Sequence, residues 1–285
     1  MKCKPIPRAM AALLAAGAIA APAAAQETLA PEVRGRPAEA SDEWAITIRG
    51  AALLTPAWMG SDEMSLSLVP DVRVQYGDEI FASIPEGLGW NAIKGSGWTI
   101  GPLAKIRFGR DEENGGSPFL ITGGSDDLLG MGDIGATAEI GGFVQKRFGA
   151  GGAWEARAEL LKGFGGHDGV VAYTSLDYRM RAGRNMISVG PRLNIVSGDF
   201  MDSYFGIDEG QSARTGLPTY RADGGILSYG MGASLLQPLG RRSAISAFGN
   251  LERLGSEAGD SPLVEERGQR LQLSLGVGYG YRFSL

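Results

Sequence analysis

The last fifteen residues form the most regular pattern in the chain, a strict alternation of apolar side chains with small or polar ones. The apolar members are Leu271, Leu273, Leu275, Val277, Tyr279, Tyr281, Phe283 and Leu285. Successive side chains of a β-strand point to opposite faces, so one whole face of this strand is apolar. Globular strands average about 5–6 residues, whereas a tilted strand needs about 9–11 to cross membrane hydrocarbon. The ending therefore predicts a membrane-spanning strand whose aromatic residues lie at the membrane–water interface.

The same alternation recurs from Glu43 onward, in segments separated by Gly, Asp, Asn, Ser and Pro. We predict strands near residues 43–54, 64–76, 79–85, 88–94, 98–109, 133–148, 153–164, 169–181, 185–198, 225–237, 241–254 and 269–285. Links after the even-numbered strands are short, whereas several links after odd-numbered strands are long, namely 110–132, 199–224 and 255–268. Outer-membrane barrels show this asymmetry, with short periplasmic turns and longer outer loops.

The sheet is expected to close on itself because its surroundings are membrane hydrocarbon. Hydrocarbon offers no hydrogen-bond partner to backbone N–H and C=O groups, so a sheet can span it only by joining its first strand to its last. We therefore predict that residues 43–285 form an all-β fold, a transmembrane antiparallel up-and-down β-barrel of about 12 strands, within a range of 10 to 14. An even strand number places both termini in the periplasm. The alternative is a soluble all-β sandwich.

The start of the chain has the three parts of a secretory signal peptide. Basic residues near the N-terminus are followed by the apolar run Met10–Ala21 and by small residues up to Ala25. This run is shorter than the roughly 20 residues of a membrane-spanning helix. We predict a signal peptide at 1–25, cleaved after Ala25, then a flexible periplasmic lead-in at 26–42, and we expect the cell outer membrane as the location.

Composition excludes several classes of protein. The single cysteine, Cys3, lies in the predicted signal peptide, so the mature chain has no disulfide and no cysteine-based metal site. The net charge is −5 for the whole chain. Removal of the three basic residues of the signal leaves a more acidic mature chain, which argues against nucleic acid as a partner. No later segment reaches 18 consecutive apolar residues, so no membrane-spanning helix is expected.

Catalytic chemistry finds little support in the sequence. His167 is the only histidine and lies in a Gly-Asp setting that predicts a polar turn residue in an outer loop. The chain has no Gly-x-Ser-x-Gly elbow, and a histidine-based zinc site needs more than one histidine. We predict no enzyme activity and no catalytic, cofactor-binding or metal-binding residues. An envelope lipid hydrolase that uses His167 as its base is the least favoured alternative.

Acidic residues gather in the predicted outer loops, at Asp111-Glu112-Glu113, at Asp126-Asp127, at Asp208-Glu209 and among Glu257, Asp260, Glu265 and Glu266. Carboxylates can hold Ca²⁺ or Mg²⁺, but none of these segments has the spacing of an EF-hand loop. We interpret them as solvated loops that face membrane lipid and lipopolysaccharide, with divalent cations shared between the two.

A second set of charges lies on the predicted inner face of the strands and has mixed signs. Its members are Lys105, Arg107, Glu139, Glu155, Arg157, Glu159, Asp177, Arg179 and Arg192. These side chains either line an open pore or form salt-bridged rungs that fill the interior, and residue types alone do not decide between the two. The position of the long loop 199–224, inside or outside the lumen, would separate plug from pore.

Several short motifs match the pattern of one known family. They are Pro56-Ala57-Trp58-Met59-Gly60-Ser61, Pro70 and Tyr76, Gly87-Leu88-Gly89, Gly130-Met131-Gly132-Asp133, Thr215-Gly216-Leu217-Pro218-Thr219-Tyr220 with Gly224-Gly225, the segment Leu254–Val264, and Gly278-Tyr279-Gly280-Tyr281-Arg282-Phe283. From about Trp44 to Leu285 the chain resembles the MltA-interacting protein (MipA/OmpV) family of outer-membrane proteins. Two departures stand out: Ser256-Glu257-Ala258 replaces a common Gly-Asp-Ala, and the chain ends on Leu285 instead of an aromatic residue.

The resemblance implies a structural protein without enzyme activity. One family member bridges a lytic transglycosylase and a penicillin-binding synthase at the murein layer, and others are described as porin-like or adhesive. The favoured hypothesis is a scaffold that links the outer membrane to a periplasmic murein transglycosylase and a penicillin-binding protein. The alternative is a small porin-like diffusion channel. The surfaces available to murein enzymes would be residues 26–42 and the short periplasmic turns.

Overall fold

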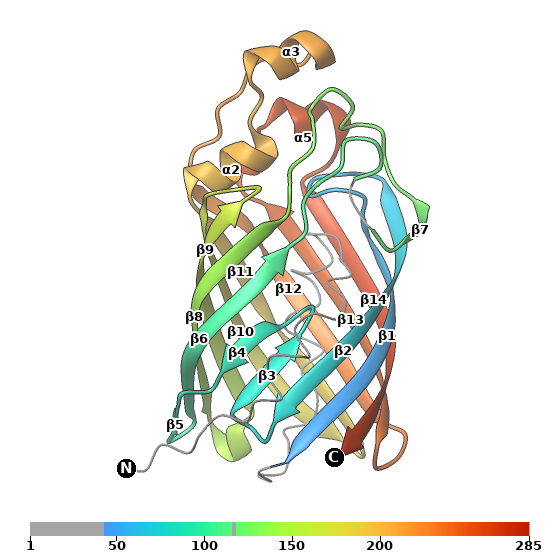
Figure 1. The fold of residues 1–285 in the computed structure, drawn as a ribbon, viewed down its shortest axis with the longest axis vertical. Coiled ribbons are helices and arrows are strands. Elements are labelled where there is room, and N and C mark those ends of the chain that lie inside the picture. Colours follow the sequence, from blue (N-terminus) through green and yellow to red (C-terminus); the bar gives the residue numbers. More distant parts are fainter. Residues whose placement is uncertain (1–42, 116–117, 285) are drawn as a thin grey trace.

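The computed structural model describes residues 43–115 and 118–284, and twelve strands of this part of the chain form one closed antiparallel ring (Figure 1). In ring order they are β1 (Trp44–Pro56), β2 (Met64–Tyr76), β3 (Ile80–Ser83), β4 (Gly87–Trp90), β6 (Trp98–Arg107), β8 (Thr137–Phe148), β9 (Trp154–Gly165), β10 (Val170–Ala182), β11 (Asn185–Val196), β12 (Gly225–Pro238), β13 (Ser243–Leu254) and β14 (Leu271–Ser284). Strand β1 pairs with both β2 and β14, which closes the ring. The predicted fold class and strand number are confirmed.

The side-chain alternation of the strands separates a lipid face from an interior. In β14, Leu275 and Val277 are 41% and 58% exposed, whereas Ser274 is 8% exposed. Large apolar side chains are exposed in the same way on the other long strands, and a soluble protein would not leave so extensive an apolar surface in water. In the described residues no helix has the length and apolar character needed to cross a membrane. The exposed apolar face of the strands is the surface that the predicted transmembrane barrel requires.

The wall is least regular between β2 and β6. Strands β3 and β4 are four residues long, and β4 meets β6 at only two paired positions. Two further short strands lie beside the ring: β5 (Ile93–Gly95) pairs with β6, and β7 (Leu120–Gly123), from the long link after β6, pairs with β2. The link that contains β7 thus adds a short strand to β2 near its outer end.

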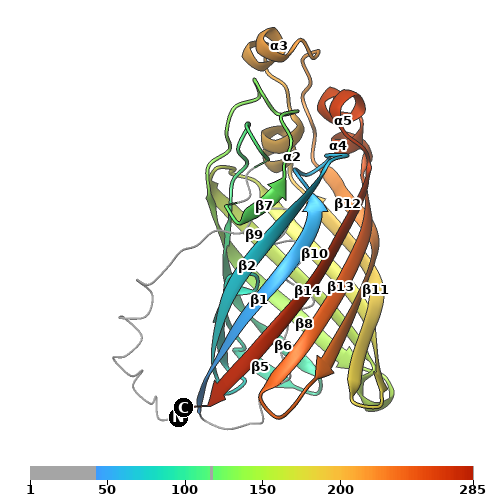
Figure 2. The same cartoon turned by 90° about the vertical axis from the view of Figure 1, so that its right-hand side faces the viewer.

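The two ends of the barrel differ in their connections. One end carries the start of β1, the end of β14 and short turns between strands, among them the 3₁₀ turn η2 (Ala150–Gly152). The other carries four short helices that the sequence analysis did not predict: α2 (Gly198–Phe205) and α3 (Glu209–Thr215) between β11 and β12, and α4 (Ser256–Gly259) and α5 (Pro262–Arg267) between β13 and β14 (Figure 2). Following the rule for outer-membrane barrels, we call these the periplasmic end and the outer end. The predicted signal peptide and lead-in lie outside the described residues.

Candidate functional site

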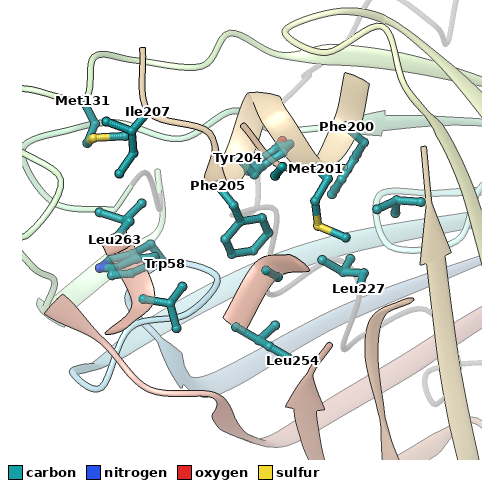
Figure 3. Packing of buried hydrophobic residues seen from close by; sticks show 14 of the residues in the cluster. Trp58, Met131, Phe200, Met201, Tyr204, Phe205, Ile207, Leu227, Leu254 and Leu263 are labelled. Carbon is teal, nitrogen blue, oxygen red and sulfur yellow. The ribbon is translucent and has the colours of Figure 1, made fainter. Parts of the chain in front are cut away.

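The outer mouth of the barrel is covered by a buried apolar cluster, which we call the cap. Its members are Ala57, Trp58, Leu128, Met131, Val171, Val196, Phe200, Met201, Tyr204, Phe205, Ile207, Leu217, Ala222, Leu227, Leu254, Ala258, Leu263 and Val264. All are at most 5% exposed, and Figure 3 shows how they interdigitate. They come from the inner face of the wall and from every long outer link, so packing between the links closes this end.

Helix α2 occupies the centre of the cap. Its buried residues Phe200, Met201, Tyr204 and Phe205 follow the spacing of one helical face. The Phe200 ring stacks on Tyr204 at 4.7 Å between centroids and makes an edge contact with His167, in the link between β9 and β10, at 4.8 Å. The sequence left open whether the loop 199–224 enters the barrel mouth. Its first helix does, whereas α3 projects outward (Figure 1).

Hydrogen bonds fasten the links of the cap to one another. The hydroxyl of Ser261 donates to the Phe205 carbonyl at 2.7 Å, and Arg110 Nη1 donates to the Tyr204 carbonyl at 2.7 Å. Arg267 donates to the carbonyls of Asp127 and Thr215, at 2.6 and 2.9 Å. Burial lowers the pKa of Arg110 from its usual value to about 10, so this guanidinium stays charged at neutral pH. These bonds satisfy carbonyl groups that the cap would otherwise bury without partners.

The cap also gathers the motifs on which the family resemblance rests. Trp58, Met131, Leu217 and Leu263 come from four different motifs and meet in this one cluster. The structure also explains why the motif at residues 56–61 has a glycine at position 60. Its φ is +115°, and a Cβ there would lie 2.7 Å from a ring carbon of Trp58. The sequence alone did not show that these motifs meet.

His167 does not have the exposed position that the sequence analysis expected of a polar turn residue. It lies in an outer link, but it is 2% exposed and faces the barrel interior. The Gly169 amide donates to its Nδ1 at 3.2 Å, so Nε2 carries the proton that is shared with Glu139 Oε1 at 3.2 Å. Both ring nitrogens are therefore used in anchoring the link, and neither bonds a hydroxyl or thiol that it could activate.

The inward charges of the strands form ion pairs with one another, either within one strand or between strands. Each of the nine residues named from the sequence has a partner, in the pairs Lys105–Glu159, Arg107–Glu139, Arg157–Glu159, Arg179–Glu155 and Arg192–Asp177. The paired atoms lie 2.5–2.8 Å apart. The sequence left open whether these charges line an open pore or form salt-bridged rungs. The structure shows salt-bridged rungs.

The periplasmic end holds a cavity of about 490 Å³ inside the barrel. Seven of its lining residues are arginines, and we call them the basic vestibule: Arg49, Arg73, Arg181, Arg184, Arg241, Arg242 and Arg282. Arg49 pairs with Asp71 and Arg73 with Glu86. Within residues 43–115 and 118–284 the other five have no carboxylate at ion-pair distance, and the lining contains no Asp or Glu. The sequence analysis did not predict this site.

The acidic clusters of the outer links serve local structure. Glu112 Oε2 accepts from the Gly130 and Gly132 amides, at 2.9 and 2.8 Å. Asp208 caps α3 in a reciprocal pair of hydrogen bonds with Gln211. In the part of the chain that the structure describes, no three His, Cys, Asp or Glu side chains gather in a way that could hold a metal ion.

Comparisons with known proteins place these features in a family. The sequence model of the family described as MltA-interacting protein MipA matches residues 48–283. The outer-membrane protein YiaT of Escherichia coli strain K12 is 28% identical over 151 residues, which are 52% of this chain. The chain spans 58% of the length of that relative.

Solved outer-membrane barrels are similar in structure. An outer-membrane channel from Pseudomonas putida F1 aligns with a TM-score of 0.47 and 11% identity, over 87% of this chain and 98% of that one. The NanC porin aligns with a TM-score of 0.39 and 10% identity, over 83% and 98% of the two chains.

Proposed function

Because the chain belongs to the MltA-interacting protein MipA family, we propose that it is a scaffold that links the outer membrane to murein enzymes at the periplasmic end. The expected partners are a murein transglycosylase, to which the family description refers, and a penicillin-binding protein. The barrel would fix these enzymes at the inner surface of the membrane. No catalytic step by the barrel itself is required for this role.

The observation that carries the proposal is the contrast between the two ends. Eighteen buried residues hold the outer links together over the outer mouth, so the barrel has the form of a closed anchor. At the periplasmic end the turns are short and leave side chains available to a partner. Leu239, in the turn between β12 and β13, is 49% exposed although it lies beyond the strand. Leu239 is therefore an apolar side chain at this end with which a partner contact can be tested.

Affinity capture tests the scaffold role. Tagged protein, extracted from envelopes in mild detergent, should retain a murein transglycosylase or a penicillin-binding protein. Leu239→Asp should lower the recovery of that enzyme at least about tenfold, because it places a charge in an apolar contact. The matched control is Leu129→Asp, since Leu129 is 48% exposed in an outer link. Recovery of no murein enzyme above an untagged background would refute the scaffold.

A conductance measurement tests the competing channel. In a planar bilayer the folded protein should show no stepwise conductance, because the cap covers the outer mouth and the strand charges are paired. Reproducible conductance steps from protein with an intact cap would favour the diffusion channel instead.

A further inference from the structure

We propose that the basic vestibule binds a small organic anion that carries two or more carboxylate or phosphate groups. This site is separate from the scaffold role and does not depend on it. Its ligand would reach it from the periplasm, since the cap covers the opposite mouth of the barrel. The first argument is the concentration of charge. The whole chain has a net charge of −5, yet among the described residues seven arginines and no carboxylates line this one cavity.

The pairing of arginines elsewhere in the barrel makes the vestibule exceptional. Above it, inward arginines such as Arg107, Arg157 and Arg192 each contact a carboxylate. In the vestibule, five of the seven do not, among the residues that the structure describes. Cations that cluster without counter-charges repel one another. An anion that enters the cavity would reduce this repulsion, so its binding is electrostatically favourable.

The shape of the site points to an organic molecule. A volume of about 490 Å³ falls within the range of about 300–1,000 Å³ that is usual for small-molecule sites. Met186, Leu236 and Phe248 contribute apolar surface to the same lining, which can contact a carbon skeleton while the guanidinium groups hold its anionic ends. Guanidinium binds both carboxylate and phosphate through two parallel hydrogen bonds, so the geometry defines the charge of the ligand and leaves both groups as candidates.

The positions of the arginines indicate two successive steps of anion binding, attraction at the rim and then binding deeper in the cavity. Arg184, Arg241 and Arg242 lie in the turns at the rim, where Arg184 directly precedes β11 and Arg242 directly precedes β13. Arg49 and Arg73 lie further along strands β1 and β2, where Asp71 and Glu86 orient their guanidinium groups. The rim would attract the anion over a Debye length of about 10 Å at 0.1 M salt. The paired arginines would then bind it in a fixed orientation.

Isothermal titration calorimetry on the purified, detergent-extracted protein tests the proposal. The probes are citrate for carboxylates, fructose 1,6-bisphosphate for phosphates, and fructose as the uncharged control. Binding of citrate, of the bisphosphate or of both supports the site, and the stronger arm identifies the group. Fructose should give no heat of binding. Absence of binding by both anions, or equal binding of fructose, would overturn the proposal.

Substitution then assigns the binding to the vestibule. The triple variant Arg184→Gln, Arg241→Gln, Arg242→Gln should weaken anion binding at least about tenfold, because it removes three of the seven positive charges that line the cavity. Arg221→Gln is the matched control, since Arg221 is exposed on an outer link. Different gel migration of unheated and boiled samples verifies that each variant is folded. Unchanged affinity in the folded triple variant, or an equal loss in the Arg221 control, would contradict the assignment.

Discussion

The two ends of this barrel use their side chains in opposite ways. At the outer end, apolar residues from several links bury one another, and the charges beneath them are paired, as in Arg107–Glu139. At the periplasmic end, arginines face a cavity and most of them lack a carboxylate partner in the described residues. Four of the seven vestibule arginines lie on strands of the wall and three lie in the turns. The difference therefore arises from inward strand residues as well as from the connections.

This difference separates stability from binding. A cluster whose members satisfy one another contributes to folding, and removal of any member leaves a cavity or an unpaired charge. The five vestibule arginines that have no carboxylate partner among the described residues contribute little to folding, so each can be removed at little cost. We therefore expect substitutions at the outer end to change stability, and substitutions at the periplasmic end to change binding.

The largest effect is expected from Phe200→Ala in the cap. Phe200 is fully buried and contacts both Tyr204 and His167. Loss of a buried phenylalanine costs about 3–5 kcal/mol, which would raise hydrogen exchange of the α2 amides by about two orders of magnitude or more. Mass spectrometry of exchange in detergent measures this change. The strands should keep their protection, because the membrane wall does not depend on the cap.

Phe164→Ala provides the comparison for this variant. Phe164 is 52% exposed on the lipid face of β9, so the same truncation there should leave exchange in α2 unchanged. If α2 exchanged at the same rate in the Phe200 variant as in the unaltered protein, the apolar cluster would not be what holds the outer mouth closed.

The next effect in size is expected from Glu139→Gln below the cap. Glu139 accepts hydrogen bonds from Arg107 at 2.7 Å and from His167 at 3.2 Å. Glutamine keeps one acceptor oxygen but removes the charge that compensates Arg107, which should cost about 1–3 kcal/mol. Denaturant unfolding in detergent, followed by tryptophan fluorescence, measures the shift in midpoint. Glu266→Gln, in exposed surroundings on α5, should not shift it. Equal midpoints for both variants would show that the ion pair of Glu139 with Arg107 does not stabilise the barrel.

The fold was accessible from the sequence because period-two alternation is a local signal. The run from Leu271 to Phe283 shows a lipid face without knowledge of any other strand. The cap was not accessible, since its helices are too short for a helical period to appear. Residues Pro262–Arg267 of α5, for example, cover less than two turns. His167 was misjudged because its burial depends on Phe200, which is distant in sequence and reaches it only in the closed barrel.

The basic vestibule was missed for a related reason. Its arginines lie between positions 49 and 282, and each alone is an ordinary inward or turn residue. Only the pairing of β1 with β14, and the order of the strands around the ring, brings them to one cavity. A prediction of the site therefore required the strand register and not only the strands.

The smallest effect on stability is expected from Arg184→Gln at the periplasmic rim. Arg184 is exposed in the turn between β10 and β11 and has no ion-pair partner among the described residues. Its loss should change the free energy of unfolding by less than about 0.5 kcal/mol, within the error of the same denaturant titration. A loss as large as that of Glu139→Gln would mean that this guanidinium is a structural group. The proposed difference between the two ends would then be wrong, because the side chains of both ends would stabilise the fold and neither end would be free to bind a ligand.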